Sequence, residues 1–241
     1  YKNLVKNMCI NSFAVVCTTF EQKIKIQKYC KNVHLILDNH TDIVNCKKKS
    51  YECSDTFNLV WEGQPGGVDN LIKLKNIILN ISKSTPITLN IITDPVMPKY
   101  FEKIGKKNTN TFLKKKFNNV NFIEWNKYNF CAEAIKCDLA IIPIDLDNNF
   151  DAGKPENKLL LFWKMGLPTI VSPTPSYTYA MKNAGVDGLV YDNNWKCEIL
   201  KYINNKKLRT YNGEFGFKYV SSKYEKKRYV DLWDTLFNEI S

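Results

Sequence analysis

The stretch that decides the fold runs from Asp138 to Val171 and reads DLAIIPIDLDNNFDAGKPENKLLLFWKMGLPTIV. Leu139–Ile144 is a short apolar run rich in isoleucine, which is typical of a parallel-sheet strand buried on both faces. A polar loop follows, and Pro155 is expected to open a helix, because proline is favoured at the first helical position. The helix is expected to stop at Gly166, just before a second strand at Pro168–Val171. The pattern predicts a right-handed β–loop–α–β unit.

The first turn of this helix carries polar groups that suit an anion. In such a unit the helix N-terminus faces the crevice beyond the strand, where free N–H groups and the helix dipole favour negative charge. Two cations and two groups able to bond hydroxyls lie in this turn: Lys154, Glu156, Asn157 and Lys158. We interpret it as a sugar-phosphate or nucleotide-phosphate site. The alternative is an ordinary polar first turn, with lysines that serve solubility.

A second phosphate candidate follows an earlier strand. Thr56–Trp61 reads as a strand and runs directly into the segment EGQPGG at residues 62–67. A glycine-rich turn between a strand and a helix lets the backbone approach a phosphate closely. The motif is neither G-x-G-x-x-G nor a P-loop, because no Gly-Lys-Ser/Thr follows. Glycine used for turn geometry alone explains the segment equally well.

Strands and helices alternate through the rest of the chain. Apolar runs and periodicity predict further strands over residues 12–18, 33–37, 87–93, 120–125 and 188–191. Helices are expected over residues 19–30, 68–82, 99–104, 111–117, 128–136, 177–184 (capped by Ser176), 194–204, and from about 215 to the C-terminal end. This order predicts an α/β fold: a doubly wound, mainly parallel Rossmann-like sheet with helices on both faces.

A polar segment without periodicity, residues 38–55, is the best candidate for a domain boundary. Before it lie only two strands and a helix, which are too few to form a domain alone. Residues 1–45 are therefore expected to be the end of a preceding domain and its crossover. Residues 46–241 are expected to form one ligand-binding domain that closes with a long C-terminal helix.

Composition narrows the function classes. No apolar run reaches the roughly 20 residues needed to cross a membrane. The eight cysteines form no C-x-x-C pair and the chain has two histidines, so a zinc site has little support and free thiols in a reducing cytoplasm are expected. The net charge of +11 is carried almost wholly by lysine. Nucleic-acid binding is not expected, because arginine and aromatic residues interleaved on one basic face are absent.

The densest run of positive charge is formed by five lysines: Lys106, Lys107, Lys114, Lys115 and Lys116. A solvated face is the simpler interpretation of this run. Contact with an anionic membrane surface is the next.

The order of these features resembles the C-terminal, donor-binding half of a GT-B-type glycosyltransferase, closest to family 4, group 1. Residues 14–43, AVVCTTFEQKIKIQKYCKNVHLILDNHTDI, resemble the last β–α–β of the N-terminal domain and its crossover. Residues 58–71, NLVWEGQPGGVDNL, resemble the first strand and phosphate turn of the donor domain. Residues 154–177, KPENKLLLFWKMGLPTIVSPTPSY, resemble the donor-site helix, and the ending WDTLFNEI resembles the helix that packs back across both domains.

The resemblance implies a nucleotide-sugar donor and a set of residues that bind it. Lys158, with Lys154, would stabilise the charge on the leaving nucleotide diphosphate, and Glu156 would reach the ribose. The donor-binding set implied in this way is Gly63, Gln64, Gly66, Gly67, Trp125, Asn126, Lys154, Asn157, Thr174 and Ser176. Trp125 and Asn126 would flank the base, although core packing explains Trp125 equally well. Thr174, Ser176 and Tyr177 would line the sugar pocket.

No metal or other cofactor is expected, since lysine and a helix dipole can carry the charge stabilisation. The loop with Asp145, Asp147 and Asp151 is more simply explained by turn chemistry than by a metal. The expected partners are the donor and a glycan or lipid-linked acceptor. The expected location is the cytoplasm, with possible peripheral contact at the inner face of a membrane.

Two positions depart from the family pattern. Such enzymes usually carry two glutamates eight residues apart around this helix, and the corresponding places here hold Gly153 and Leu161. A non-catalytic sugar-nucleotide or phosphate-binding module on the same fold is therefore the alternative. A related epimerase is disfavoured, because the chain offers only His34, within a strand, and His40, which could face the cleft.

Overall fold

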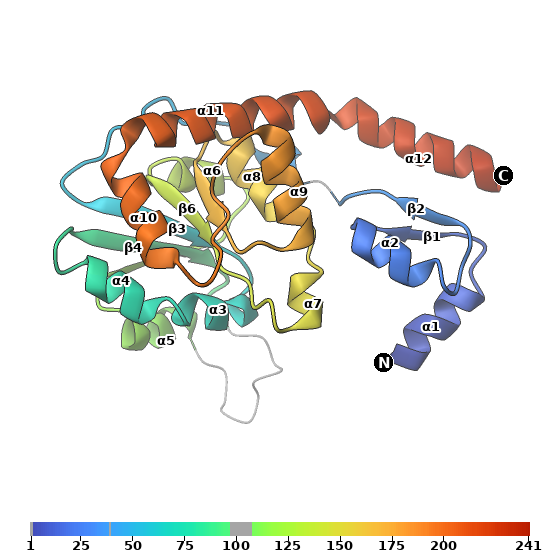
Figure 1. The fold of residues 1–241 in the computed structure, drawn as a ribbon, viewed down its shortest axis with the longest axis horizontal. Helices are drawn as coiled ribbons and strands as arrows, with labels where there is room; N and C mark the ends of the chain where they lie inside the picture. The colour runs from blue at the N-terminus through green and yellow to red at the C-terminus, as the bar shows by residue number, and fades with distance from the viewer. Residues whose placement is uncertain (1, 39, 97–107) are drawn as a thin grey trace.

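The computed structural model describes residues 2–38, 40–96 and 108–241. A large α/β unit and a small N-terminal unit lie side by side, and the last helix runs from the first toward the second (Figure 1). The expected helix at residues 99–104 lies outside the described residues, as do Lys106 and Lys107 of the lysine run. None of the described helices combines the length and hydrophobicity needed to cross a bilayer.

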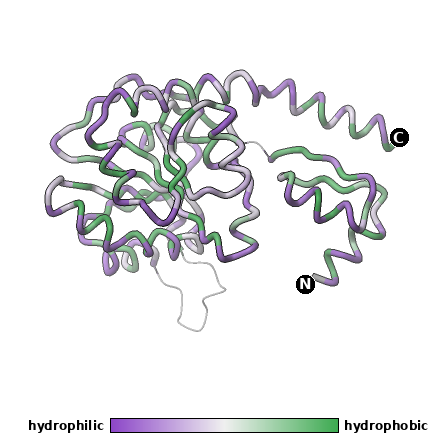
Figure 2. Tube along the Cα trace, in the orientation of Figure 1, coloured by the Kyte–Doolittle hydropathy of each residue, from purple (hydrophilic) through white to green (hydrophobic). Residues whose placement is uncertain are grey.

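The large unit is built on a five-stranded sheet in the order β5-β4-β3-β6-β7, and every pair of neighbours is parallel. Its strands are β3 (Phe57–Glu62), β4 (Ile87–Thr93), β5 (Val120–Glu124), β6 (Leu139–Ile142) and β7 (Thr169–Val171). The predicted parallel α/β fold is therefore confirmed. In Figure 2 the strands at the centre of this unit are predominantly hydrophobic, as expected for a sheet covered on both faces.

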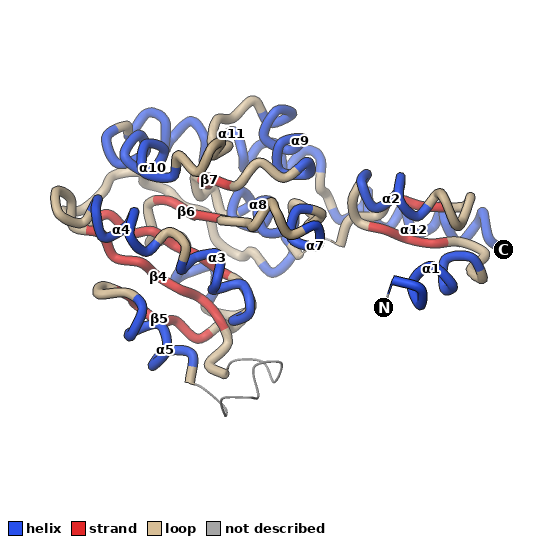
Figure 3. The backbone as a smooth tube through the Cα atoms, turned by 60° about the horizontal axis from the view of Figure 1, so that its bottom comes forward, coloured by secondary structure: helices blue, strands red, loops and turns tan. Residues whose placement is uncertain are grey.

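Helices cover both faces of this sheet (Figure 3). One face packs against α6 (Phe130–Ala134), α8 (Asn157–Lys164), α9 (Pro175–Ala184) and α11 (Lys206–Lys223). The other packs against α3 (Val68–Ile72), α4 (Lys75–Ile81), α5 (Thr109–Lys116) and α10 (Trp195–Asn204). Neighbouring residues of β3 illustrate the division, since Val60 belongs to the first core and Leu59 to the second.

The strand order places a switch point between β3 and β6. The chain leaves β3 toward β4 on one side, and leaves β6 toward β7 on the other. Ligands of open α/β sheets bind in the crevice at the carboxyl ends of such strands. The glycine turn after β3 and the loop after β6 therefore share one edge of the sheet.

The prediction of a strand at residues 188–191 is wrong. This segment forms an isolated parallel bridge, between Val171 and Leu189, and no strand. Gly188 has φ +138°, and a Cβ added to it would lie 2.6 Å from the carbonyl oxygen of Thr169. Asp192 and Asn193 then take positive φ angles of 50° and 55°. The chain thus turns away from the sheet after a single pairing.

Two expected long helices are each divided in the structure. The helix expected at residues 68–82 is split into α3 and α4, which meet at Lys73 and Leu74. The helix expected from residue 215 onward is α11 followed by α12 (Lys226–Ile240). Between them Glu225 is extended, with φ −72° and ψ 145°, and the Tyr224 hydroxyl donates to Glu156 Oε1 at 3.2 Å. The helical periodicity did not predict this break. The break coincides with the tertiary contact between Tyr224 and Glu156.

Helix starts also differ from the expectation. Helix α8 begins at Asn157 rather than Pro155, and a short helix, α7 (Asn149–Ala152), lies within the expected loop. Helix α9 begins at Pro175, so Thr174 rather than Ser176 is the capping residue. The end of α8 agrees with the prediction, because Gly166 follows it in the left-handed region with φ +68°.

The N-terminal unit contains α1 (Lys2–Ile10), α2 (Phe20–Ile26) and two parallel strands, β1 (Val15–Cys17) and β2 (Val33–Leu35). A short 3₁₀ turn, Thr41–Ile43, lies in the crossover to the large unit. Helix α12 lies beside this unit (Figure 1), and a groove between them is lined by side chains of both. His34 Nε2 lies 3.6 Å from Glu239 Oε2, which links β2 to the end of α12.

The expectation of free thiols alone is wrong for one pair of cysteines. Cys46 and Cys131 form a disulfide that joins the crossover to α6, with their Cα atoms 6.2 Å apart. The free cysteines are Cys9, Cys17, Cys30, Cys53, Cys137 and Cys197. The two partners are separated by 85 residues, so sequence spacing gave no sign of the pairing.

Candidate functional site

A cleft of ≈ 810 Å³ opens at the carboxyl ends of β3 and β6. Its walls are the glycine turn, the end of β5, the loop before α8 with its first turn, and one residue of α9. The crossover contributes His40 and Ile43. Seven residues of the sequence-predicted donor set line this cleft, and so does Lys158, the predicted charge-stabilising residue; the seven are Gly63, Gln64, Gly66, Gly67, Trp125, Lys154 and Asn157. Tyr177 and His40, also considered from the sequence, line it too.

Glu156 is placed apart from these residues. It occupies the N-cap position of α8, and its Oε1 accepts a hydrogen bond from the Tyr224 hydroxyl at 3.2 Å. Burial raises the pKa of the Glu156 carboxyl, and the hydrogen bond from Tyr224 opposes that rise. Glu156 therefore contacts the α11–α12 junction and is not among the residues that line the cleft.

Three further predicted residues lie outside the cleft lining. Asn126 closes the turn after β5, where its Oδ1 accepts from the backbone N–H of Tyr128 at 2.9 Å. Thr174 is fully buried, and its Oγ1 accepts from the backbone N–H of Tyr177 at 3.3 Å. Ser176 is buried in the first turn of α9. In this structure Asn126 therefore stabilises a turn and Thr174 caps a helix, and neither side chain lines the cleft.

Lys158 lies across the glycine turn. Its Nζ donates a hydrogen bond to the backbone oxygen of Glu62, lies 3.9 Å from Glu62 Oε2, and sits 5.0 Å from the ring centroid of Trp61. A Cβ added at Gly63 would come within 2.6 Å of this Nζ. A side chain at this position would displace the ammonium group from its place across the turn.

The side chains of Lys158 and Glu62 are both largely shielded from solvent. Burial lowers the pKa of the Lys158 ammonium, and the Glu62 carboxylate opposes that change. Burial likewise raises the pKa of Glu62, and Lys158 opposes that change. Each group stabilises the charge of the other against the cost of leaving water.

Sequence reasoning missed several residues of the cleft. Trp61 and Glu62, the last two residues of β3, line it, as do Asn70 and Phe150. Trp61 is 2% exposed and was counted only as part of a strand. The position of Trp61 and Glu62 in the sequence could have indicated their role, because residues at the carboxyl end of a strand beside a switch point face the ligand crevice.

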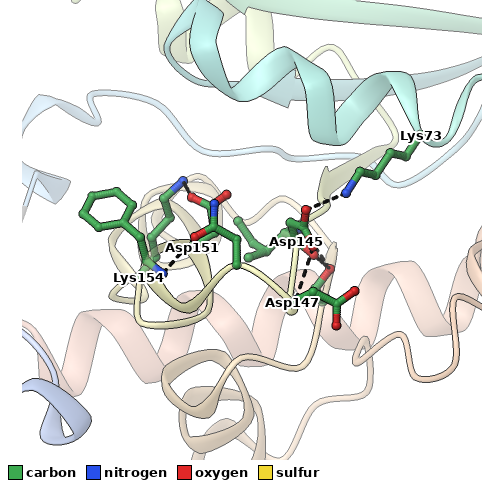
Figure 4. Close-up of polar contacts among 9 residues, drawn as sticks. Lys73, Asp145, Asp147, Asp151 and Lys154 are labelled. Carbon is green, nitrogen blue, oxygen red and sulfur yellow. Dashed lines mark hydrogen bonds and ion pairs between the residues drawn. The ribbon is translucent and has the colours of Figure 1, made fainter.

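The aspartate loop is occupied by its own ion pairs (Figure 4). Asp145 Oδ2 lies 2.7 Å from the Nζ of Lys73, and Asp145 Oδ1 accepts from the backbone N–H of Asp147 at 3.2 Å. The hydrogen bond from Lys73 lowers the pKa of Asp145. Asp151 Oδ1 lies 2.6 Å from Lys154 Nζ. Within the described ranges no group of three or more His, Cys, Asp or Glu side chains is placed to hold a metal ion.

No family model and no curated protein sequence matches the chain. Solved structures do. S. aureus TarM, in a structure with UDP, fondaparinux and α-GlcNAc-glycerol, aligns with 98% of this chain at 14% identity and a TM-score of 0.71. A glycosyltransferase from Rickettsia africae aligns with 99% at 12% identity and a TM-score of 0.70. Anabaena HepE, in a structure with UDP and glucose, aligns with 99% at 9% identity and a TM-score of 0.69.

These similarities establish the fold. The chain has the fold of the C-terminal half of GT-B glycosyltransferases, with a Rossmann-like sheet at its centre. It spans about half the length of TarM, since the alignment covers 46% of that chain, and 67% and 66% of the other two. The resemblance noted from the sequence is thus confirmed at the level of the fold.

Proposed function

We propose that this chain is the donor-binding half of a glycosyltransferase that transfers a sugar from a nucleoside-diphosphate sugar to an acceptor. One observation carries the proposal. The Lys158 ammonium group lies across the Gly63–Gly67 turn, inside a cleft at the switch point of a parallel sheet. A cation, a glycine turn and a helix N-terminus that converge at one place form a site for a diphosphate.

The proposed mechanism uses these groups in order. The backbone of the glycine turn and the first turn of α8 would bind the diphosphate, while Trp125, 37% exposed at the cleft, would contact the base. Negative charge grows on the diphosphate as the bond to the sugar breaks. Lys158, helped by Lys154, would stabilise that charge without a metal ion.

We propose UDP as the nucleotide and a hexose as the sugar. The TarM structure contains UDP, and HepE structures contain UDP with glucose or UDP-glucose. Those ligands belong to proteins of the same fold at 9–14% identity, so they support the choice of first ligand to test.

We propose a glycan or lipid-linked molecule as the acceptor, bound mainly by the domain to which residues 1–45 would belong. In this view residues 46–241 form the donor domain. The net charge of +11 supports contact with the anionic inner face of a membrane. Vesicles containing anionic lipid would bind the protein at low salt and release it at high salt if this location is right.

Calorimetric titration with UDP, GDP, ADP and CMP tests the proposed function. We expect selective, saturable binding of one diphosphate, and about 10- to 100-fold weaker binding by Lys158→Ala, since a charge-assisted hydrogen bond contributes about 1.5–3 kcal/mol. The matched control is Lys201→Ala, because Lys201 on α10 pairs with Glu198 of the same helix and with Asp187, and none of the three lines the cleft. No binding of any nucleotide by the wild-type chain would contradict the proposal, as would equal losses in the two variants.

A non-catalytic nucleotide-sugar-binding module is the second candidate. At the two positions where the family usually carries glutamate, this chain has Gly153 and Leu161. The lack of these two carboxylates favours a module that binds the donor without catalysis. Leu161 lines the cleft and supplies no hydrogen-bonding group there. An assay of the full-length gene product with UDP-glucose separates the two. An enzyme releases UDP in step with glucose transfer or hydrolysis, whereas a module binds the donor and leaves it intact.

A further inference from the structure

The cleft contains a carboxylate that the proposed mechanism does not use. Glu62 is the last residue of β3 and directly precedes the glycine turn. Its side chain lines the cleft and is 16% exposed. A carboxylate beside a diphosphate site is unfavourable unless it has a task, because like charges repel at close range.

The hydrogen-bonding capacity of this carboxylate is largely unused. Its nearest cation, Lys158, lies 3.9 Å from Oε2 and gives its hydrogen bond to the Glu62 backbone oxygen instead. In the described part of the chain, no group donates a hydrogen bond to the Glu62 carboxylate. Asp151, the other carboxylate in the cleft lining, differs, because Lys154 lies 2.6 Å from it. Glu62 therefore retains acceptor sites that face the cleft.

A ligand hydroxyl would match these acceptors. Burial raises the pKa of the Glu62 carboxyl, Lys158 and His40 oppose that rise, and Asp94 adds to it, so nearby cations stabilise the charged form but do not replace the hydrogen bonds that water would give. A hydroxyl group donates a hydrogen bond to a carboxylate without adding negative charge, and so restores part of the lost hydration. A ligand that carries only phosphate groups would gain nothing from Glu62.

We propose that Glu62 binds a hydroxyl group of the donor while Lys158 binds its diphosphate. The cleft then selects ligands that present a diphosphate and a hydroxyl together, and Glu62 is a specificity-determining residue. This inference rests on the proposed function, in which the donor is a nucleoside-diphosphate sugar. The hydroxyl belongs to the ribose or to the transferred sugar, and both sources have the same chemistry.

The test is calorimetric titration of UDP-glucose, UDP and inorganic pyrophosphate into the wild-type chain, Glu62→Gln and Glu62→Ala. We expect Glu62→Ala to bind UDP-glucose at least about tenfold more weakly, and Glu62→Gln to fall between it and the wild type. Pyrophosphate binding should be unchanged or tighter in both variants, because a negative charge has been removed. An equal loss for UDP and UDP-glucose assigns the hydroxyl to the ribose, and a loss confined to UDP-glucose assigns it to the sugar.

Two results would overturn the inference. Pyrophosphate binding that weakens as much as UDP-glucose binding would mean that Glu62 acts only by positioning Lys158. Unchanged affinity for all three ligands would mean that Glu62 contacts none of them. Glu198→Gln, which removes one negative charge from α10, is the control, and thermal unfolding verifies that each variant is folded. Wild-type protein that binds pyrophosphate but neither nucleotide would instead refute the proposed function, and the inference with it.

Discussion

At the scale of single residues, Glu156 shows how one contact redirects a side chain. It stands at the first turn of α8 beside Asn157 and Lys158, yet its carboxylate accepts from the hydroxyl of Tyr224. The sequence indicated a polar first turn and could not indicate which of its members face the cleft. That choice depends on Tyr224, which is 68 residues away.

Tyr224→Phe should destabilise the protein by about 1–2 kcal/mol, because it removes the hydrogen bond to a partly buried carboxylate and leaves that group less well satisfied. Urea unfolding followed by circular dichroism measures the change. Tyr211→Phe is the control, since its exposed hydroxyl donates to the Gly185 oxygen and should matter by less than about 0.5 kcal/mol. Equal effects of the two substitutions would contradict the assigned contact.

The raised pKa of Glu156 gives a pH dependence of known sign. A carboxyl whose pKa is higher in the folded state binds more protons there, so its contribution to stability is fully present below the unfolded pKa and is lost as pH rises through the folded pKa. The stability of the wild type relative to Glu156→Gln should therefore fall as pH rises from about 4 to 7. Unfolding midpoints at a series of pH values measure it, and a difference that grows in the opposite direction would refute the assignment.

At the scale of elements, the strands were predictable and the helix breaks were not. Apolar runs with β-branched residues marked all five strands of the main sheet, and four of them are largely buried, whereas the edge strand β5 is only partly buried. The prediction of a strand at residues 188–191 and the prediction of one long C-terminal helix were wrong for the same reason. The geometry of Gly188 against Thr169, and the contact of Tyr224 with Glu156, are made between segments distant in sequence. Local periodicity contains no record of them.

The packing of α11 on α8 depends on small residues. A Cβ added at Gly216 would lie 2.6 Å from the Trp163 ring, which is fully buried. Gly216→Ala should therefore cost about 1–3 kcal/mol through overpacking, in spite of the better helix propensity of alanine. Urea unfolding of Gly216→Ala beside Ser222→Ala, an exposed position on the same helix, measures the cost. A stabilised Gly216→Ala protein would show that the two helices do not pack as described.

At the scale of the whole molecule, the cleft joins segments from the crossover to α9. The sequence could locate the glycine turn and the first turn of α8, because each has a local signature. It could not indicate that Lys158 would cross the turn at Gly63, or that Glu62 would face the same space. The Cys46–Cys131 disulfide is a third feature of this kind, since it joins segments 85 residues apart.

The division into 1–45 and 46–241 predicts separate behaviour of α12. Among the side chains described for α12, Leu236 is buried, and the groove beside it is formed largely with residues of the N-terminal unit such as Ile36. Residues 46–241 alone should fold cooperatively around their own two cores. In hydrogen exchange, α11 should keep its protection while α12 loses it. Full protection of α12 in the shortened chain would show that the large unit alone holds it.

A crystal structure of the protein with UDP tests the central claim most directly. We expect the diphosphate to lie at the Gly63–Gly67 turn, with Lys158 Nζ within hydrogen-bond distance of a phosphate oxygen and the uracil toward Trp125. UDP bound elsewhere on the molecule, or a bound diphosphate with no oxygen within hydrogen-bond distance of Lys158 Nζ, would contradict the account.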